Sequence, residues 1–258
     1  MNKTRCSLCV LAAASLWGCI GVFLHPLTAL GLTALQIVVV RTAGSALLLT
    51  AALGLFRPGL LRIDWRDGWI FFGTGVLSLL FFNWCYFGAI REVGLSVAAV
   101  LLYTSPIFVL LLSAALFGER LTRRKLLALG LTFAGCALVT GALGQSGAIG
   151  ARGLLLGLGA GFGYALYSIF GRFALRKYAS LTITVWTFLC CGAASLLLAA
   201  CTDGLPPMRW LVAEKSGLFA VLGLTLLCCV LPYFLYTAGL SGIETGRAAM
   251  LATVEPAV

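Results

Sequence analysis

The chain has 258 residues, of which 61% are hydrophobic and 10% are charged, and its mean hydropathy is +1.07. Soluble domains carry about 25% charged residues, so this composition excludes a water-soluble globular protein and indicates an integral membrane protein. The net charge of +10 does not indicate a nucleic-acid partner, because no basic patch interleaved with aromatic residues occurs in a solvated stretch. Basic residues in the loops between apolar segments instead set the orientation of a membrane protein.

Apolar segments long enough to cross a bilayer, which takes about 20 residues of helix, follow one another along the whole chain. A short basic leader, residues 1–5, precedes the first span, which we expect to stay uncleaved because a second span follows at once. His25-Pro26 is predicted to end the first span, and Arg91-Glu92 to form a tight turn before the fourth. The nine predicted spans are Leu8–Leu24, Leu32–Phe56, Trp69–Ile90, Leu95–Phe117, Leu126–Leu143, Leu154–Phe173, Leu181–Cys201, Leu218–Leu240 and a segment that starts near Arg247.

A charged hinge joins the fourth and fifth predicted spans. Its residues, Glu119–Lys125, include five charges, which cannot lie in hydrocarbon and therefore mark a membrane surface. A hinge this short predicts an antiparallel helix hairpin. Pro106 falls near the middle of the fourth span, where it would clash with the carbonyl group of Leu102 and remove a backbone donor. We therefore expect a kink beside a cavity, where neighbours or water can satisfy the freed group.

These same segments carry a family resemblance. Tyr-Thr-Ser-Pro at 103–106, Phe-Gly-Glu-Arg-Leu-Thr at 117–122 and a glycine-rich helix after them resemble the EamA-type domain of the drug/metabolite transporter superfamily. The resemblance extends over nearly the whole chain. It implies an all-α polytopic membrane protein of ten helices, built from two inverted five-helix repeats. It also implies secondary transport of a small metabolite, an amino acid or a drug-like amphiphile by alternating access, with export favoured by analogy with the family.

The second half of the chain repeats the first. A shift of 150 residues places Asn83–Phe108 on Tyr233–Val258 without a gap, and Pro106 then meets Pro256. Five spans in each repeat would invert the second repeat in the membrane, and such transporters bind substrate at the repeat interface near the midplane. The expected domains are residues 5–143, the first repeat, and residues 150–258, the second.

The second repeat is predicted to be incomplete. The first repeat ends near Gly141, and the same shift of 150 residues puts its counterpart near residue 291, beyond Val258. We therefore expect an apparently truncated chain of about nine spans, which lacks the end of the ninth helix, a second hinge and a tenth helix. A fragment and an inactive truncated remnant are both open interpretations.

Positive charges are unevenly divided between the two predicted faces. Of the 18 Lys and Arg residues, 13 lie on the side of the N-terminus and four on the opposite side, namely Arg91, Arg152, Arg209 and Lys215. The positive-inside rule then predicts a cytoplasmic N-terminus. The expected location is the inner membrane of a cell, crossed many times.

Polar and aromatic groups inside the spans are the candidate binding residues, because polar side chains that face lipid are costly and tend to point inward. Arg41 could attract an anionic group and Glu255 could exchange protons during transport, the alternatives being snorkelling of Arg41 and a structural hydrogen bond of Glu255. Aromatic walls suit a small amphiphilic solute, although the same aromatic residues could simply pack helices together. The candidate substrate-binding residues are Trp17, Arg41, Asn83, Tyr86, Tyr103, Ser105, Tyr164, Tyr167, Tyr236 and Glu255, with Pro106 and Pro256 as helix-kink positions.

No catalytic residue, metal site or cofactor is predicted. The ten cysteines lie almost all within apolar spans, where they act as small packing residues. A membrane-embedded lipid-modifying enzyme is the alternative function, but it would need His, Asp or Glu clustered near one surface, and the chain has one histidine. The expected partners are a small-molecule substrate and the lipid bilayer, without nucleic acid, and a homodimer is a possible assembly.

Overall fold

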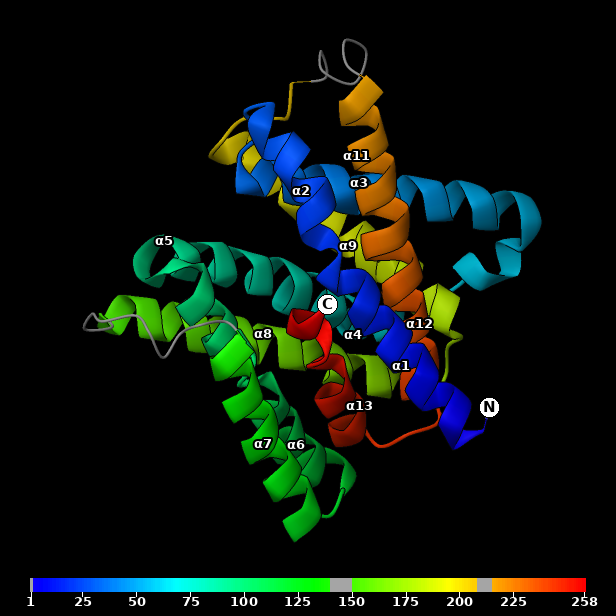
Figure 1. Cartoon of the computed structure of the whole chain (residues 1–258). Helices are drawn as coiled ribbons and strands as arrows, with labels where there is room; N and C mark the ends of the chain where they lie inside the picture. The colour runs from blue at the N-terminus through cyan, green and yellow to red at the C-terminus, as the bar shows by residue number, and fades with distance from the viewer. Residues whose placement is uncertain (1, 140–149, 208–214) are drawn as a thin grey trace.

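The computed structural model describes residues 2–139, 150–207 and 215–258, and in these ranges the chain forms helices and connections but no strand (Figure 1). Six uninterrupted helical stretches of the described residues are long and apolar enough to cross a membrane. This confirms the predicted all-α polytopic fold. The helices are α1 (Lys3–Gly18), α2 (Ile20–Ala29), α3 (Ala34–Phe56), α4 (Gly68–Phe72), α5 (Phe81–Leu102), α6 (Ser105–Phe117), α7 (Arg123–Val139), α8 (Ala151–Ala174), α9 (Ser180–Cys201), α11 (Lys215–Thr225), α12 (Leu231–Leu240) and α13 (Thr245–Ala252).

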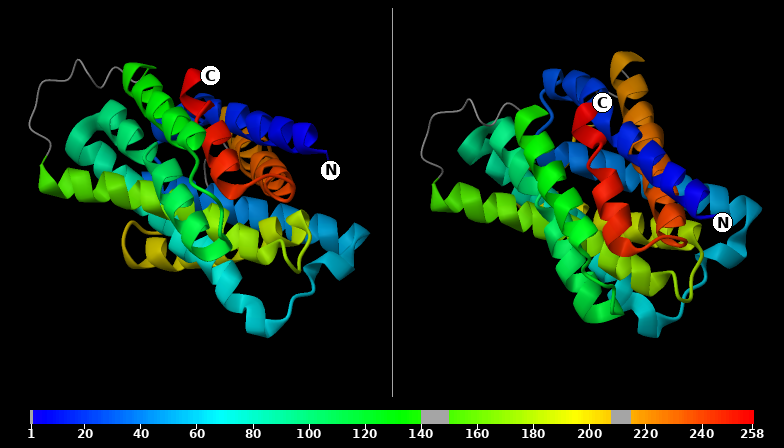
Figure 2. Two further views of the ribbon diagram at one scale, coloured as in Figure 1. Left: turned by 90° about the horizontal axis from the view of Figure 1, so that it is seen from below. Right: turned by 60° about the horizontal axis from the view of Figure 1, so that its bottom comes forward.

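Helices of the first half pack against helices of the second half. α1 packs on α12, α3 on α9, and α5 on α8, as the views in Figures 1 and 2 show. Between the two repeats, α1 corresponds to α8, α3 to α9, and α5 to α12. The contacts α1–α12 and α5–α8 are therefore equivalent, and the contact α3–α9 joins two equivalent helices. The core of the molecule is therefore the interface between the two repeats, which is where a site shared by both repeats must lie.

Both repeats contain a π-helical segment at the same place. One, η3 (Gly73–Leu80), lies between α4 and α5, and the other, η5 (Leu226–Val230), lies between α11 and α12. A shift of 150 residues puts the second segment on residues 76–80 of the first. π-Helical turns are rare and occur often at functional sites. Because the two π-helical segments fall at equivalent positions, the two repeats agree in backbone conformation as well as in sequence.

The fourth span is broken rather than kinked. α5 continues through Arg91-Glu92, so the turn predicted there is wrong, and the chain turns instead at Gly94, whose φ of 78° suits glycine. α6 then begins with Pro106 in its first turn, where the missing N–H group has no helical partner to lose. In the second repeat α13 is followed in the same way by η6 (Glu255–Ala257), with Pro256 near its start. Pro106 and Pro256, which were predicted to kink helices, therefore lie in the first turn of a helix instead.

The first span also differs from its prediction. It begins at Lys3 rather than near Leu8, breaks at Cys19, and continues through Pro26 to Ala29, so His25-Pro26 does not end it. Leu27, beyond the proline, is fully buried in a cluster with residues of α11. This tertiary packing holds the helix together although Pro26 removes one backbone hydrogen bond. The predicted end of the fifth span at Leu143 lies outside the described residues.

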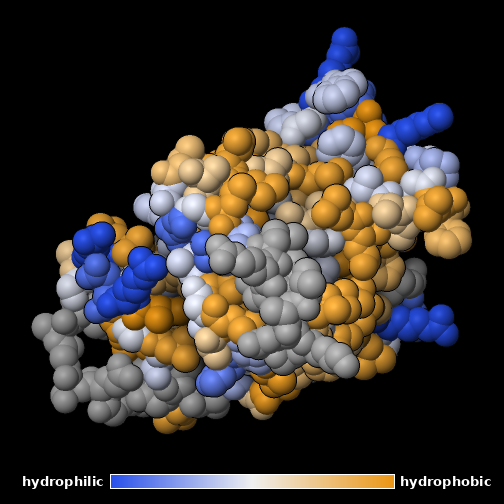
Figure 3. Space-filling view, turned by 90° about the horizontal axis from the view of Figure 1, so that it is seen from above, coloured by the Kyte–Doolittle hydropathy of each residue, from blue (hydrophilic) through white to orange (hydrophobic). Residues whose placement is uncertain are grey.

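Apolar side chains cover most of the face seen in Figure 3, and hydrophilic side chains gather mainly at its margins. Large apolar residues are exposed on many helices, for example Leu47 on α3 and Leu197 on α9. An exposed apolar surface of this extent is expected of a protein whose helices face lipid.

The charged hinge between α6 and α7 binds the start of α13. The Glu119 carboxylate accepts the backbone N–H of Thr245 at 2.7 Å and that of Gly246 at 3.2 Å, and Lys125 forms a salt bridge of 2.7 Å with Glu244. Burial by itself would raise the pKa of Glu119, but the two backbone hydrogen bonds and Lys125 outweigh it and hold the pKa below its ordinary value. The hinge therefore ties the first repeat to the second at one membrane face.

Candidate functional site

A cavity of about 410 Å³ lies between the two repeats. This volume is within the range of small-molecule sites, about 300–1,000 Å³. Its lining comes from α1, α2, α3, α5, α8, α12 and η6, together with Tyr103 at the break before α6. Of the predicted binding and kink residues, those that line this central cavity are Trp17, Arg41, Asn83, Tyr86, Tyr103, Tyr164, Glu255 and Pro256.

Arg41 reaches into the cavity from α3 and is held by α5. Its Nη2 donates a hydrogen bond of 2.5 Å to the Oδ1 atom of Asn83. The Nδ2 atom of Asn83 in turn donates to the carbonyl group of Leu79, at the end of the π-helical segment η3, at 2.7 Å. This second bond fixes the amide so that its oxygen faces the guanidinium group. The Nε atom of Arg41 is buried without a hydrogen-bond partner among the described residues, which leaves one donor for a ligand or water.

Glu255 is the negative counterpart of Arg41 in the same cavity. Its Oε2 atom is buried and has no hydrogen-bond partner in the part of the chain that the structure describes. The segment η6 sits close against α1 because Gly18 has no side chain: a Cβ atom there would lie 2.8 Å from the carbonyl oxygen of Glu255. No salt bridge between described residues joins Glu255 to Arg41. The cavity thus holds one basic and one acidic side chain that do not pair with each other.

Three predicted binding residues do not line the cavity. Tyr236 and Tyr167 are buried in an aromatic cluster around Trp17, where Tyr236 shares a hydrogen bond of 2.7 Å with Ser168, and Tyr167 one of 2.8 Å with Thr237. The predicted convergence of Asn83, Tyr86, Tyr103 and Tyr236 in one pocket therefore holds for the first three only. Ser105, with Pro106, is buried at the start of α6 away from the cavity lining.

Tyr233 lines the cavity, although it was not among the predicted binding residues. It is the counterpart of Asn83 under the shift of 150 residues, so the repeat itself contained the signal. Its ring packs edge-on against Trp17 with 5.1 Å between ring centroids. Phe82 and Phe87 also line the cavity, and they carry no signal in the sequence beyond their position on α5 beside Asn83.

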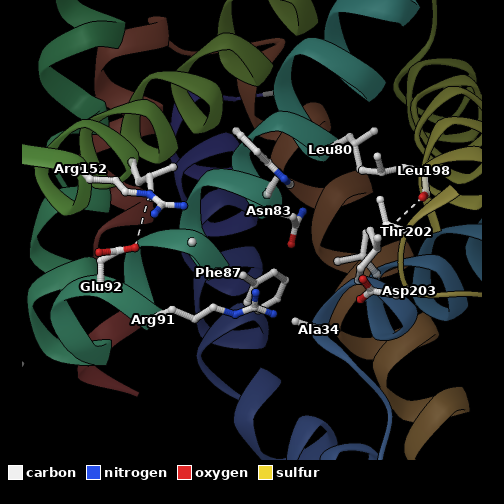
Figure 4. A pocket seen from close by; sticks show the side chains of 15 residues that line it. Ala34, Leu80, Asn83, Phe87, Arg91, Glu92, Arg152, Leu198, Thr202 and Asp203 are labelled. Atoms are coloured by element: carbon white, nitrogen blue, oxygen red, sulfur yellow. Dashed lines mark hydrogen bonds and ion pairs between the residues drawn. The ribbon is translucent and has the colours of Figure 1, made fainter.

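A second pocket, of about 330 Å³, adjoins the central cavity and is called the outer pocket below. The two share Asn83 and Phe87. Figure 4 shows Asn83 and Phe87 near the middle of the outer pocket, with Arg91 and Glu92 on one side and Asp203 on the other. Charged residues therefore gather around this pocket, whereas the walls of the central cavity are mainly aromatic and apolar.

Comparison with known proteins decides the family. The model of the EamA-like transporter family matches the chain twice, at residues 4–141 and 151–258. The two matches together cover nearly the whole chain. The chain belongs to this family. The resemblance of the Tyr-Thr-Ser-Pro and Phe-Gly-Glu-Arg-Leu-Thr segments to an EamA-type domain is thereby confirmed, and the chain is a multi-pass membrane protein of the EamA-like transporter family.

Two relatives of this EamA-family chain are described as transporters. An uncharacterized transporter of Archaeoglobus fulgidus is 30% identical over 185 residues, which are 70% of this chain and 63% of that protein. A probable amino-acid metabolite efflux pump of Salmonella typhimurium is 26% identical over 166 residues, 62% of this chain and 56% of that protein. The chain thus matches less than two-thirds of the length of each.

A solved structure, described only as the crystal structure of a protein, superposes with a TM-score of 0.80. The match covers 98% of this chain and 86% of the other at 20% sequence identity. At this identity the likeness concerns the fold alone.

Proposed function

We propose that this EamA-family chain is a secondary transporter that moves a small zwitterionic metabolite, such as an amino acid, across the cytoplasmic membrane. Transport proceeds by alternating access to the central cavity, and the direction is export. The observation that carries the proposal is the pair of opposite charges in that cavity. Arg41 and Glu255 each have a buried polar atom without a partner among the described residues.

A basic and an acidic side chain that do not pair with each other favour a ligand that brings one charge of each sign. A carboxylate beside Arg41 forms a charge-assisted hydrogen bond with the free Nε atom, and an ammonium group beside Glu255 pairs with its carboxylate. An uncharged solute would leave both groups desolvated and unpaired, which costs several kcal/mol per ion. The aromatic rings of Trp17, Tyr86 and Tyr164 bound the remaining space and suit an apolar side chain.

The 13-to-4 division of basic residues favours a cytoplasmic N-terminus. The direction of transport is proposed from one relative. The Salmonella typhimurium relative is described as an efflux pump for amino-acid metabolites. A carboxylate such as Glu255 inside the cavity also allows substrate movement to be coupled to a proton.

The proposal is tested in liposomes that contain the purified protein and are loaded with an equimolar mixture of the proteinogenic amino acids. Mass spectrometry follows which amino acids leave, with and without a pH gradient. We expect a small set to leave several-fold faster than from protein-free liposomes. For each of these, the uncharged-carboxyl analogue, the amino-acid amide, is measured in parallel.

Arg41→Gln is the informative variant, and Arg57→Gln, which changes an exposed loop residue, is its matched control. Loss of the guanidinium group should slow the amino acid about tenfold or more while affecting its amide less, because only the amino acid brings a carboxylate. Equal rates for Arg41→Gln, Arg57→Gln and the unmodified protein would contradict the proposed binding mode. Transport of uncharged amphiphiles alone would exclude the zwitterionic substrate.

A further inference from the structure

The outer pocket continues the central cavity along one face of two helices. On α5, Asn83, Phe87 and Arg91 follow one another at intervals of four residues, which places them on the same side of the helix. On α3, Ala34 lies seven residues, or about two turns, before Arg41. Arg41 lines the central cavity, Ala34 and Arg91 line the outer pocket, and Asn83 and Phe87 line both. The two pockets therefore lie in succession along α3 and α5, from Arg41 to Arg91.

Arg91 is the unpaired cation of the outer pocket. Arg152, on the same side of the pocket, lies 3.4 Å from the carboxylate of Glu92, and Asp203 accepts a hydrogen bond of 2.7 Å from the hydroxyl group of Thr33. Arg91 has neither a hydrogen bond nor an ion pair with any described residue. In Figure 4 its side chain extends past Phe87 toward Ala34, and no dashed line reaches it.

We propose that Arg91 forms an outer binding station for the carboxylate of the transported molecule, reached from Arg41 past Asn83 and Phe87. This inference rests on the proposed function, since it names a second site on the same route. Asn83 and Arg91 are eight residues apart, about 12 Å along the axis of α5. In this proposal the carboxylate binds the two arginines in turn.

The position of Arg91 suits release as well as capture. An exposed guanidinium group binds a carboxylate more weakly than a buried one, because water and salt screen the pair. Low-dielectric walls nevertheless concentrate its field within the pocket and raise the local concentration of anions. A weak outer station beside a stronger inner one lowers the barrier for a carboxylate that leaves Arg41, without holding it there.

A cysteine at the outer pocket tests the station without any transport measurement. Ala34→Cys is made in a variant from which the exposed Cys19 and Cys201 have been removed, and the protein is held in nanodiscs. The labelling rate is measured with an anionic methanethiosulfonate, the ethylsulfonate, and with its cationic trimethylammonium counterpart. Arg91→Gln should lower the ratio of the anionic to the cationic rate about three- to tenfold. Arg91→Lys should retain the ratio, and the double variant Glu92→Gln/Arg152→Gln, the matched control, should change it less than about twofold because it removes an ion pair with no net charge.

Binding is measured by protection of the same cysteine. Isocaproate supplies a carboxylate on a small apolar chain, and isocaproamide has the same shape without the charge. We expect isocaproate alone to slow labelling, and its half-protecting concentration to rise about fivefold in Arg91→Gln. Unchanged rate ratios and equal protection in Arg91→Gln would overturn the outer station.

The two proposals fail in distinguishable ways. Protection by isocaproate without efflux from loaded liposomes would leave the anion site standing and remove the proposed transport of amino acids. Efflux of amino acids without protection at the outer pocket would keep the proposed function and remove the outer station. If Arg91→Lys retains the anionic preference, the loss of that preference in Arg91→Gln reflects the missing charge and not misfolding.

Discussion

The third and eighth spans of this EamA-family chain share one backbone but carry different side chains. Both contain a π-helical segment in the same register, Gly73–Leu80 and Leu226–Val230. After it, the third span presents Asn83, which holds Arg41, whereas the eighth presents Tyr233 at the equivalent position, which packs edge-on against Trp17, and both residues line the cavity. The repeated backbone therefore creates an interface, and the unequal side chains decide which part of its lining is polar and which is aromatic.

The same contrast occurs at the two broken helices. Ser105 and Glu255 occupy equivalent positions directly before a proline at a helix start. Ser105 is buried away from the cavity, while Glu255 lines it with an unpaired oxygen. A residue in one repeat can therefore be compared with the residue at the equivalent position in the other repeat. The four predictions below use such pairs of residues or contacts between neighbouring residues.

The largest effect is expected at Glu255. Glu255→Gln keeps the size and the hydrogen-bonding capacity of the side chain but cannot titrate, so efflux from liposomes should fall about tenfold or more and lose pH dependence. Ser105→Ala should change the rate less than about twofold. The thermal midpoint should not fall in Glu255→Gln, because an unpaired buried carboxylate contributes no stability. Wild-type rates with unchanged pH dependence in Glu255→Gln would leave only a structural role for this residue.

Two glycines at equivalent positions test the packing of the repeats. A Cβ atom at Gly73 would lie 2.5 Å from the ring of Phe170, and one at Gly223 would lie 2.2 Å from the ring of Phe23. Gly73→Ala and Gly223→Ala should each destabilise the protein by about 1–3 kcal/mol through overpacking. Thermal unfolding in detergent measures both.

Phe23→Leu supplies the control for this pair. It should restore part of the stability of Gly223→Ala and none of that of Gly73→Ala, because only Gly223 faces Phe23. Equal rescue of both variants, or no loss in either, would show that the close approach of these helices is not needed.

Smaller effects are expected at the paired tyrosines. Tyr236→Phe removes the hydrogen bond with Ser168 and should destabilise the protein by about 1 kcal/mol. Tyr86→Phe should change stability by less than about 0.5 kcal/mol, since no described residue accepts or donates a hydrogen bond to its hydroxyl group. A double-mutant cycle with Ser168→Ala isolates the Tyr236 contribution. An additive cycle would mean that the 2.7 Å contact does not contribute to stability.

The smallest effect is a local one at the charged hinge. The pKa of Glu119 lies below the ordinary carboxyl value of 4.5 in the folded protein. The contact with α13 is therefore fully present above that ordinary value and is lost as the pH falls through the lower, folded-state pKa. Hydrogen exchange at the backbone amides of Thr245 and Gly246, corrected for the intrinsic rate, should quicken below about pH 4.5.

Glu119→Gln should reproduce this faster exchange at neutral pH, because a neutral amide accepts the two N–H groups less strongly. Glu92→Gln, which alters an exposed ion pair elsewhere, serves as the control. Slow exchange at Thr245 in Glu119→Gln would indicate that the hinge contact does not depend on the charge.

The sequence by itself determined the spans and their repetition. The predicted spans Leu32–Phe56 and Leu181–Cys201 correspond to α3, Ala34–Phe56, and α9, Ser180–Cys201. Such agreement is possible because the cost of placing a polar residue in hydrocarbon is a local property of each segment. The shift of 150 residues likewise pairs the two prolines, and it gives Asn83 a counterpart in Tyr233. Arg41 and Glu255 stood out as candidates because charges inside spans are rare.

Only the tertiary structure decided where helices break and which side chains meet. Pro26 lies within a continuous helix because Leu27 beyond it is buried against α11, whereas Pro106 begins a new helix. Tyr236 and Tyr86 occupy equivalent places in the sequence repeat, yet one is buried in the aromatic cluster and the other lines the cavity. These outcomes depend on the helix from the opposite repeat that packs against each residue. Hydropathy and spacing describe a helix by itself and contain no information about that partner.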